Sequence, residues 1–203
     1  ISSFNKSKLK SVEYISKSRT PYLPYSSIIL EEIMNIANPK NVICSISGIR
    51  EGSLAKDLFK NSDSNFVFNK SLEHISKKRG DLGSTYKKYF DFIKPIFEGN
   101  EHFNQKLLHL SCVLSHMDWG LGAFQKAELV FQETLNTPLL KLSHKERIQL
   151  ALSCYWRYCS IKYNPKIEYL TFLNNNEIYS CKQVGAALRL SLIHISEPTR
   201  LWT

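Results

Sequence analysis

Histidine and acidic side chains in the middle of the chain are the residues best suited to bind a metal. His109, His116 and Asp118 lie near one another in the sequence, and His144 follows further on. Metal-dependent phosphohydrolases of the HD type need such ligands brought together on helices. No His-Asp dyad is intact at these positions. We therefore predict no metal site, and we interpret His109 and His116 as partly exposed helix residues.

Nucleophilic catalysis has less support from the sequence. Cys154 and Cys159 have no histidine placed to activate them within the same expected helix. Ser53 and Ser143 are better explained as caps of helix N-termini, and Glu51 as the ion-pair partner of its neighbour, Arg50. The five cysteines form no C-x-x-C pair, so we expect buried free thiols in a reducing cytoplasm. We predict no catalytic residue in this chain.

Basic residues are the third candidate group. The net charge is +9, which suits a polyanion such as nucleic acid, an acidic membrane or polyphosphate. Phosphate binding needs converging cations or helix N-termini. The alternative is that these lysines form an ordinary solvated surface. The candidate polyanion-binding residues are Arg50, Lys77, Lys78, Arg79, Lys87 and Lys88.

One stretch of the sequence predicts the helix and strand that position these residues. Val42–Ile46 is a short β-rich run, Gly48 makes a turn, and Ser53 is expected to begin a helix that carries Leu54 and Leu58. A strand that leads through a glycine turn into a helix can present Arg50 at a sheet edge. An ordinary strand-to-helix connection explains the same pattern.

Apolar periodicity predicts helices on both sides of this stretch. Before it, a helix is expected from Ser26 to Ala37, ended by Asn38-Pro39. After the polar loop at 60–65, nearly all of the chain has helical periodicity, so we place a domain boundary there. Ser143 and Glu146 form a capping box before the fifth of these helices. The helices expected after the boundary are 66–78, 84–97 with a kink at Pro95, 101–116, 123–135, 144–161 and one that begins near Ser180.

Four segments of the chain resemble one known family. Ser45–Leu54 resembles the S-x-x-G-(L/V)-R-E-G-x-L segment of the exopolyphosphatase / guanosine pentaphosphate phosphohydrolase family. Leu23–Glu31, Leu114–Trp119 and Gly185–Leu190 are similar to the LPYAALVLE, LSDIGW and LGxALRLA segments of its α-proteobacterial members. The four occur in the family's order at roughly the family's spacing. One departure is that His116 stands at the family's Asp position and Asp118 at its Gly position.

The resemblance implies a fold and an activity. Residues 1–59 would be the C-terminal end of an actin-like (ribonuclease H-like) α/β lobe, and residues 60–189 a truncated all-α, HD-like domain, giving a mostly α, α+β fragment. Members of the family release terminal phosphate from polyphosphate, or the 5′ phosphate of guanosine pentaphosphate, with Mg²⁺. Their catalytic glutamate and phosphate loops lie in the N-terminal half, which this chain does not contain. A homodimer and a cytoplasmic location are also implied.

The C-terminal residues are expected to be foreign to the protein. Leu190 to Arg200 match, residue for residue, the translation of a common transposon-based sequencing-library adapter. We therefore expect residues 190–203 to be adapter read-through and the native sequence to end near Arg189. The alternative is a genuine C-terminal strand built on Leu192, Ile193 and Ile195. At the other end, the chain begins at Ile1, which we expect to lie within a domain.

Two other functions remain open at this stage. A basic helical module without catalysis would bind nucleic acid or a protein through one face, although interleaved acidic residues such as Asp91 and Glu98 make nucleic acid the less favoured partner. A free-standing HD-type metallohydrolase is the third alternative, and the broken dyad argues against it. No stretch approaches the ~18–20 apolar residues of a membrane span, so no membrane partner is expected.

Overall fold

The computed structural model describes residues 16–42, 48–58, 64–78, 85–116, 122–139, 142–163, 165 and 167–196. By contacts the chain divides into two units, Ile1–Cys44 and Ser45–Thr203. The described residues are mostly helical, which agrees with the expected all-α domain. The boundary expected near residue 60 from composition remains a prediction, as does the actin-like lobe.

Among its described residues, 16–42, the first unit has one long helix. A 3₁₀ turn, η1 (Thr20–Tyr22), leads into α2 (Leu23–Ala37), which begins slightly before the expected Ser26 and has a proline in its first turn. The helix ends at Asn38, whose left-handed backbone (φ 40°) lets its amide donate to the carbonyl of Met34 at 2.8 Å. No side chain of α2 is buried.

The predicted strand Val42–Ile46 lies almost wholly outside the described residues. Only Val42 is described, and it belongs to neither a helix nor a strand. The expected helix start at Ser53 is wrong, because α3 (Ile49–Leu58) begins just after Gly48 and contains Arg50 and Ser53. The Glu51 carboxylate accepts a hydrogen bond from the Gly48 amide at 2.8 Å. Glu51 therefore stabilises the N-terminus of this helix, which starts earlier than the serine suggested.

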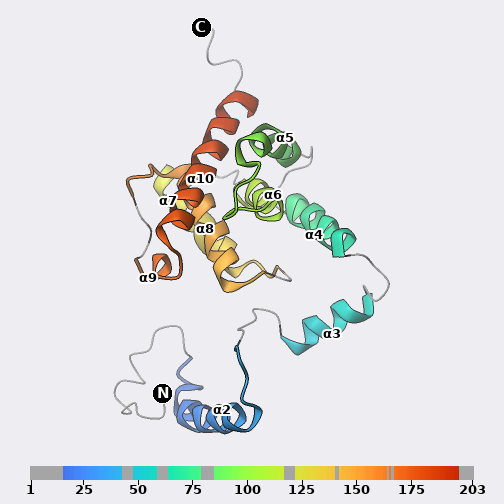
Figure 1. The fold of residues 1–203 in the computed structure, drawn as a ribbon, viewed down its shortest axis with the longest axis vertical. Helices are drawn as coiled ribbons and strands as arrows, with labels where there is room; N and C mark the ends of the chain where they lie inside the picture. Colours follow the sequence, from blue (N-terminus) through green and yellow to red (C-terminus); the bar gives the residue numbers. More distant parts are fainter. Residues whose placement is uncertain are drawn as a thin grey trace. The chain divides into compact units, whose positions relative to one another are not determined.

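The second unit continues as a set of helices around α8 (Figure 1). Periodicity predicted most of them to within a few residues, and the proline kink is present where η2 follows α5. In order they are α4 (Ser64–Lys78), α5 (Thr85–Ile93), η2 (Lys94–Phe97), α6 (Gln105–Leu114), α7 (Ala123–Asn136), α8 (His144–Tyr158), α9 (Ile167–Leu170) and α10 (Asn175–Ser196).

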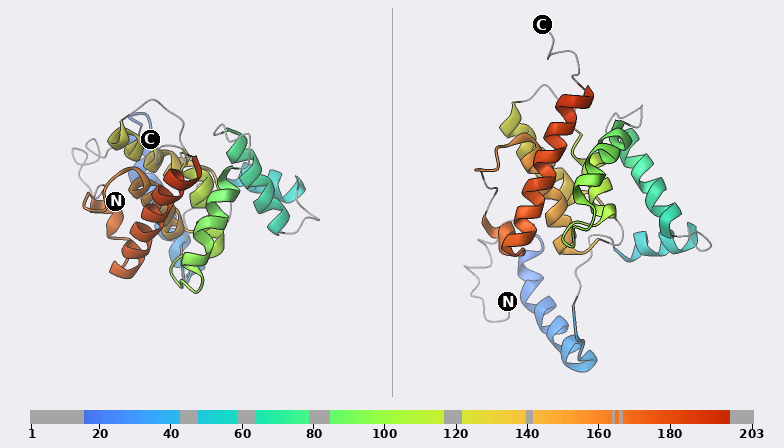
Figure 2. Two further views of the ribbon diagram at one scale, coloured as in Figure 1. Left: turned by 90° about the horizontal axis from the view of Figure 1, so that it is seen from above. Right: turned by 45° about the horizontal axis from the view of Figure 1, so that its top comes forward.

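Helix α8 is the centre of this unit. It packs extensively against α7 and α10 (Figures 1 and 2). Every side chain from Arg147 to Arg157 is buried. Both arginines donate hydrogen bonds to oxygens of other segments, which offsets part of the cost of burying them. Arg147 donates to the carbonyls of Leu135, Thr137 and Leu139, and Arg157 donates to the Ser115 hydroxyl at 2.5 Å.

Helix α10 begins earlier than expected and extends further. Asn174 and Glu177 cap it reciprocally: each side chain accepts a backbone amide of the other at 2.9 Å. The expected start at Ser180 is therefore wrong. The backbone is helical through Ser196, so the alternative of a strand over Leu192–Ile195 is also wrong.

The capping box of α8 gives the first testable prediction. The Ser143 hydroxyl accepts the Glu146 amide at 3.2 Å, and the Glu146 carboxylate accepts the Ser143 amide at 2.8 Å. Replacing Ser143 by alanine should lower the free energy of unfolding by about 1 kcal/mol, measured by urea denaturation. Ser143→Asp keeps a capping oxygen and should stay close to the wild type. Equal stability of the alanine variant would contradict the role of this cap.

Candidate functional site

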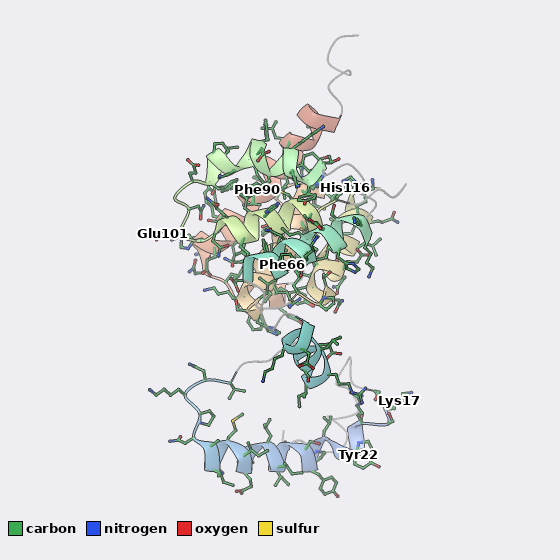
Figure 3. All side chains as sticks on the ribbon, turned by 90° about the vertical axis from the view of Figure 1, so that its right-hand side faces the viewer. Lys17, Tyr22, Phe66, Phe90, Glu101 and His116 are labelled. Carbon is green, nitrogen blue, oxygen red and sulfur yellow. The ribbon has the colours of Figure 1, made fainter. Side chains whose placement is uncertain are left out.

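Four of the predicted cations lie on two helices of the second unit. Lys77 and Lys78 form the last turn of α4, and Lys87 and Lys88 lie in the first turns of α5; all four side chains are exposed. Figure 3 marks both helices through Phe66 on α4 and Phe90 on α5. Arg50 is exposed on α3. Arg79 lies outside the described residues.

Two of these lysines act on the same carboxylate. The pKa of Glu73 on α4 is lowered, first by a hydrogen bond and the charge of Lys70, whose Nζ lies 3.0 Å from Oε2, and further by the charges of Lys77 and Lys87. We call Lys70, Lys77 and Lys87 with Glu73 the lysine cluster. Its members lie on α4 and α5, and its three positive charges exceed its one negative charge. Lys78, Lys88 and Arg50 are not among the cations that act on Glu73.

Sequence reasoning missed Lys70 because it stands alone between neutral residues. The signal was available, since positions 70, 73 and 77 recur on one face of a helix. A lysine at 70 pairs with Glu73, and a lysine at 77 lies on the same side one turn later. Lys77 also complements the negative C-terminal end of α4, which is a structural reason for a cation at that position.

An aromatic box lies beside the lysine cluster and is built around His109 of α6. The ring of His109 stacks on Phe90 with centroids 4.4 Å apart, and Tyr86 and Phe68 approach at 5.5 and 6.4 Å. Its Nε2 is buried and has no hydrogen-bond partner among the described residues. The partly exposed state expected for His109 is therefore correct for the side chain as a whole, whereas its Nε2 atom is buried.

The other candidate metal ligands are not brought together. His116 follows the end of α6 and is half-buried, His144 is the first residue of α8, and Asp118 lies outside the described residues. Within the parts of the chain that the structure describes, no three His, Cys, Asp or Glu side chains are close enough to hold a metal ion.

The described cysteines are free and buried, as expected, and Cys44 lies outside the described residues. Burial raises the pKa of Cys181 to about 12 and also raises the pKa values of Cys112 and Cys159. A thiol with a raised pKa has very little of the reactive thiolate at neutral pH. These cysteines therefore serve packing.

A small cavity of about 260 Å³ lies between η2 and the start of α6. Phe97, Phe103 and Leu108 contribute apolar surface, while Lys94 and Glu98 contribute opposite charges. The two charges offset each other, so this cavity is a poorer place for a polyanion than the exposed lysine cluster.

Comparison with known proteins does not identify the chain. No protein-family model, curated protein or solved structure matches it. Over the described residues, no helix has both the length and the apolar character needed to cross a bilayer.

Proposed function

We propose that this chain is the helical part of an exopolyphosphatase-type phosphohydrolase and that it binds the anionic substrate through the lysine cluster. The substrate would be inorganic polyphosphate or guanosine pentaphosphate, from which the parent enzyme releases phosphate with Mg²⁺. The catalytic glutamate and phosphate loops would belong to a preceding part of the same protein. The observation that carries the proposal is the contact of Lys70 with the exposed Glu73 carboxylate at 3.0 Å, together with the charges of Lys77 and Lys87, which also lower the pKa of Glu73.

The chemistry of the cluster suits a phosphate chain better than a shaped ligand. Lysine ammonium groups are flexible point charges, so they attract phosphate oxygens without demanding one orientation. Lysines of α4 and of α5 would then bind successive phosphates of an extended polyanion. Glu73 holds Lys70 in place and leaves the cluster with a net positive charge.

The segments that resemble the exopolyphosphatase family support the proposal independently of the lysine cluster. Several of their residues hold helices together. Ser115 accepts hydrogen bonds from Arg157 through its hydroxyl and from Tyr158 through its carbonyl. Gly185 and Arg189 pack α10 against α8. Residues with such roles are expected to recur among proteins that share this arrangement of helices, whatever their substrate.

The test is binding of long-chain polyphosphate to the full chain by isothermal titration calorimetry. Lys77→Glu/Lys87→Glu should weaken binding at least about tenfold, because two attractions become repulsions. Lys40→Glu/Lys162→Glu makes the same change in net charge at two exposed lysines outside the cluster and should have a much smaller effect. Equal losses in both double variants would show that only net charge matters and would contradict a localised site.

A competition experiment distinguishes the proposed function from nucleic-acid binding. Single-stranded DNA at the same phosphate concentration should displace polyphosphate poorly. If DNA binds more tightly than polyphosphate and loses affinity in the same cluster variant, the chain is a nucleic-acid-binding module instead. The activity itself requires the full-length protein with Mg²⁺: absence of phosphate release from both polyphosphate and guanosine pentaphosphate would refute the phosphohydrolase assignment.

A further inference from the structure

Helix α4 is attached to the rest of the second unit mainly through α6. Leu72 is almost fully buried at this junction, and Phe68 meets the ring of His109 edge-on. The other side of the His109 ring belongs to α5, through Phe90 and Tyr86. His109 thus lies where α4, α5 and α6 come together, and the lysine cluster spans two of these helices.

The environment of His109 accommodates a neutral ring and disfavours a charged one. A protonated imidazole has two N–H donors, and the buried Nε2 has no acceptor among the described residues. Placing an unpaired charge among three aromatic side chains is costly. The neutral ring, in contrast, stacks on Phe90 in the same way as another aromatic residue would.

Charged groups around His109 do not reverse this preference. Lys87 of α5 repels a proton on the ring, and Asp91 of the same helix attracts one more weakly. On α4, Glu73 lies within the influence of Lys87. Lys106 of α6 lies over the Phe68 ring at 5.8 Å, and Phe68 in turn contacts the ring of His109, so Lys106 adds a positive charge on that side.

We propose that protonation of His109 releases α4 and thereby separates Lys70 and Lys77 from Lys87, so that polyanion binding is lost in mild acid. This inference rests on the proposed function for its binding consequence but not for the release of α4. The expected direction is unusual. A simple basic surface gains charge as its histidines protonate and binds polyanions more tightly at lower pH.

The sign of the pH dependence follows from the pKa shift. Burial lowers the pKa of His109 below its ordinary value of 6.5, Lys87 lowers it further, and Asp91 opposes both. The unfolded or released state therefore binds the proton more readily than the packed state. The stability of the α4 junction is fully present above pH 6.5 and declines as the pH falls toward the lowered pKa.

Hydrogen exchange of the full chain tests the release of α4 without any ligand. Protection of amides in residues 64–78, corrected for intrinsic rates, should fall about tenfold between about pH 7.5 and about pH 5.5. His109→Phe keeps an aromatic ring without a proton and should abolish the change, and His109→Leu, which is smaller, should do the same. His74→Gln alters an exposed histidine of α4 and should keep the change.

The outcomes separate this inference from the proposed function. The switch is wrong if protection of residues 64–78 does not change with pH in the wild type. It is also wrong if acid lowers this protection as much in His109→Phe and His109→Leu as in the wild type. Polyphosphate affinity should then be measured at the two pH values: it should fall in acid for the wild type and rise or stay level for His109→Phe. If protection falls in acid but polyphosphate binds at neither pH, the switch stands and the proposed function fails.

Discussion

Gly185→Ala is expected to lower the free energy of unfolding by about 2 kcal/mol, even though alanine favours a helix more than glycine does. A Cβ at position 185 would lie 2.6 Å from the Cβ of Trp156 and 2.9 Å from the carbonyl oxygen of Ser153. The second of these contacts is with the backbone of α8, so no side-chain rotation relieves it. The helices α8 and α10 would have to move apart.

Glycine 52 provides a matched control for this substitution. It also lies inside a helix, α3, but a Cβ added there would meet no atom within 4 Å. Gly52→Ala should therefore be neutral or slightly stabilising, by up to about 1 kcal/mol. Both variants are compared by urea denaturation followed by circular dichroism. A Gly185→Ala protein as stable as the wild type would show that α8 and α10 do not approach this closely.

Arg189→Met is expected to cost about 3 kcal/mol of stability. From α10, the guanidinium donates to the carbonyls of Trp156 and Arg157, each at 2.8 Å, and to that of Cys159. These oxygens lie at the C-terminal end of α8, where no further helical amide is available to them and where the helix dipole favours a positive charge. Methionine preserves the apolar stem and removes all three hydrogen bonds.

Two variants on the same helix check that interpretation by urea denaturation. Arg189→Lys keeps the charge but not the forked geometry, so it should recover only part of the loss. Gln183→Met introduces the same side chain at an exposed position of α10 and should have little effect. A Lys variant no more stable than the Met variant would show that geometry alone matters. A Met variant with no loss would refute the role of Arg189 as a cap.

Local sequence signals predicted much of the helical unit. Helix α8 was expected from Ser143 and Glu146 because a capping box and apolar periodicity agreed there. The start of α10 was missed although Asn174 and Glu177 have the same spacing, because the asparagines at 174–176 fit a hairpin as well as the end of a helix. The start of α3 was missed because Glu51 was assigned to an ion pair with Arg50, whereas it accepts the Gly48 amide.

The candidate site was harder to predict because its contacts join distant residues. The runs at Lys77 and Lys87 were visible in the sequence, but their shared effect on Glu73 depends on how α4 and α5 both pack against α6. The packing of His109 against Phe68 joins residues on different helices, and no local pattern signals it. Gly185 was noticed as part of a resembling segment, while its close approach to Trp156 emerged only from the structure.

Helix α8 packs against α7, which precedes it in the chain, and against α10, which follows it. The ribosome therefore synthesises these two packing partners at different times. Helix α7 is already made when α8 emerges, but the residues from Cys159 to Ser196 take on the order of two to eight seconds to synthesise. During that interval the surface that α10 will cover remains exposed to water and to other nascent chains. The most protected helix of the finished protein is therefore its most vulnerable one during translation.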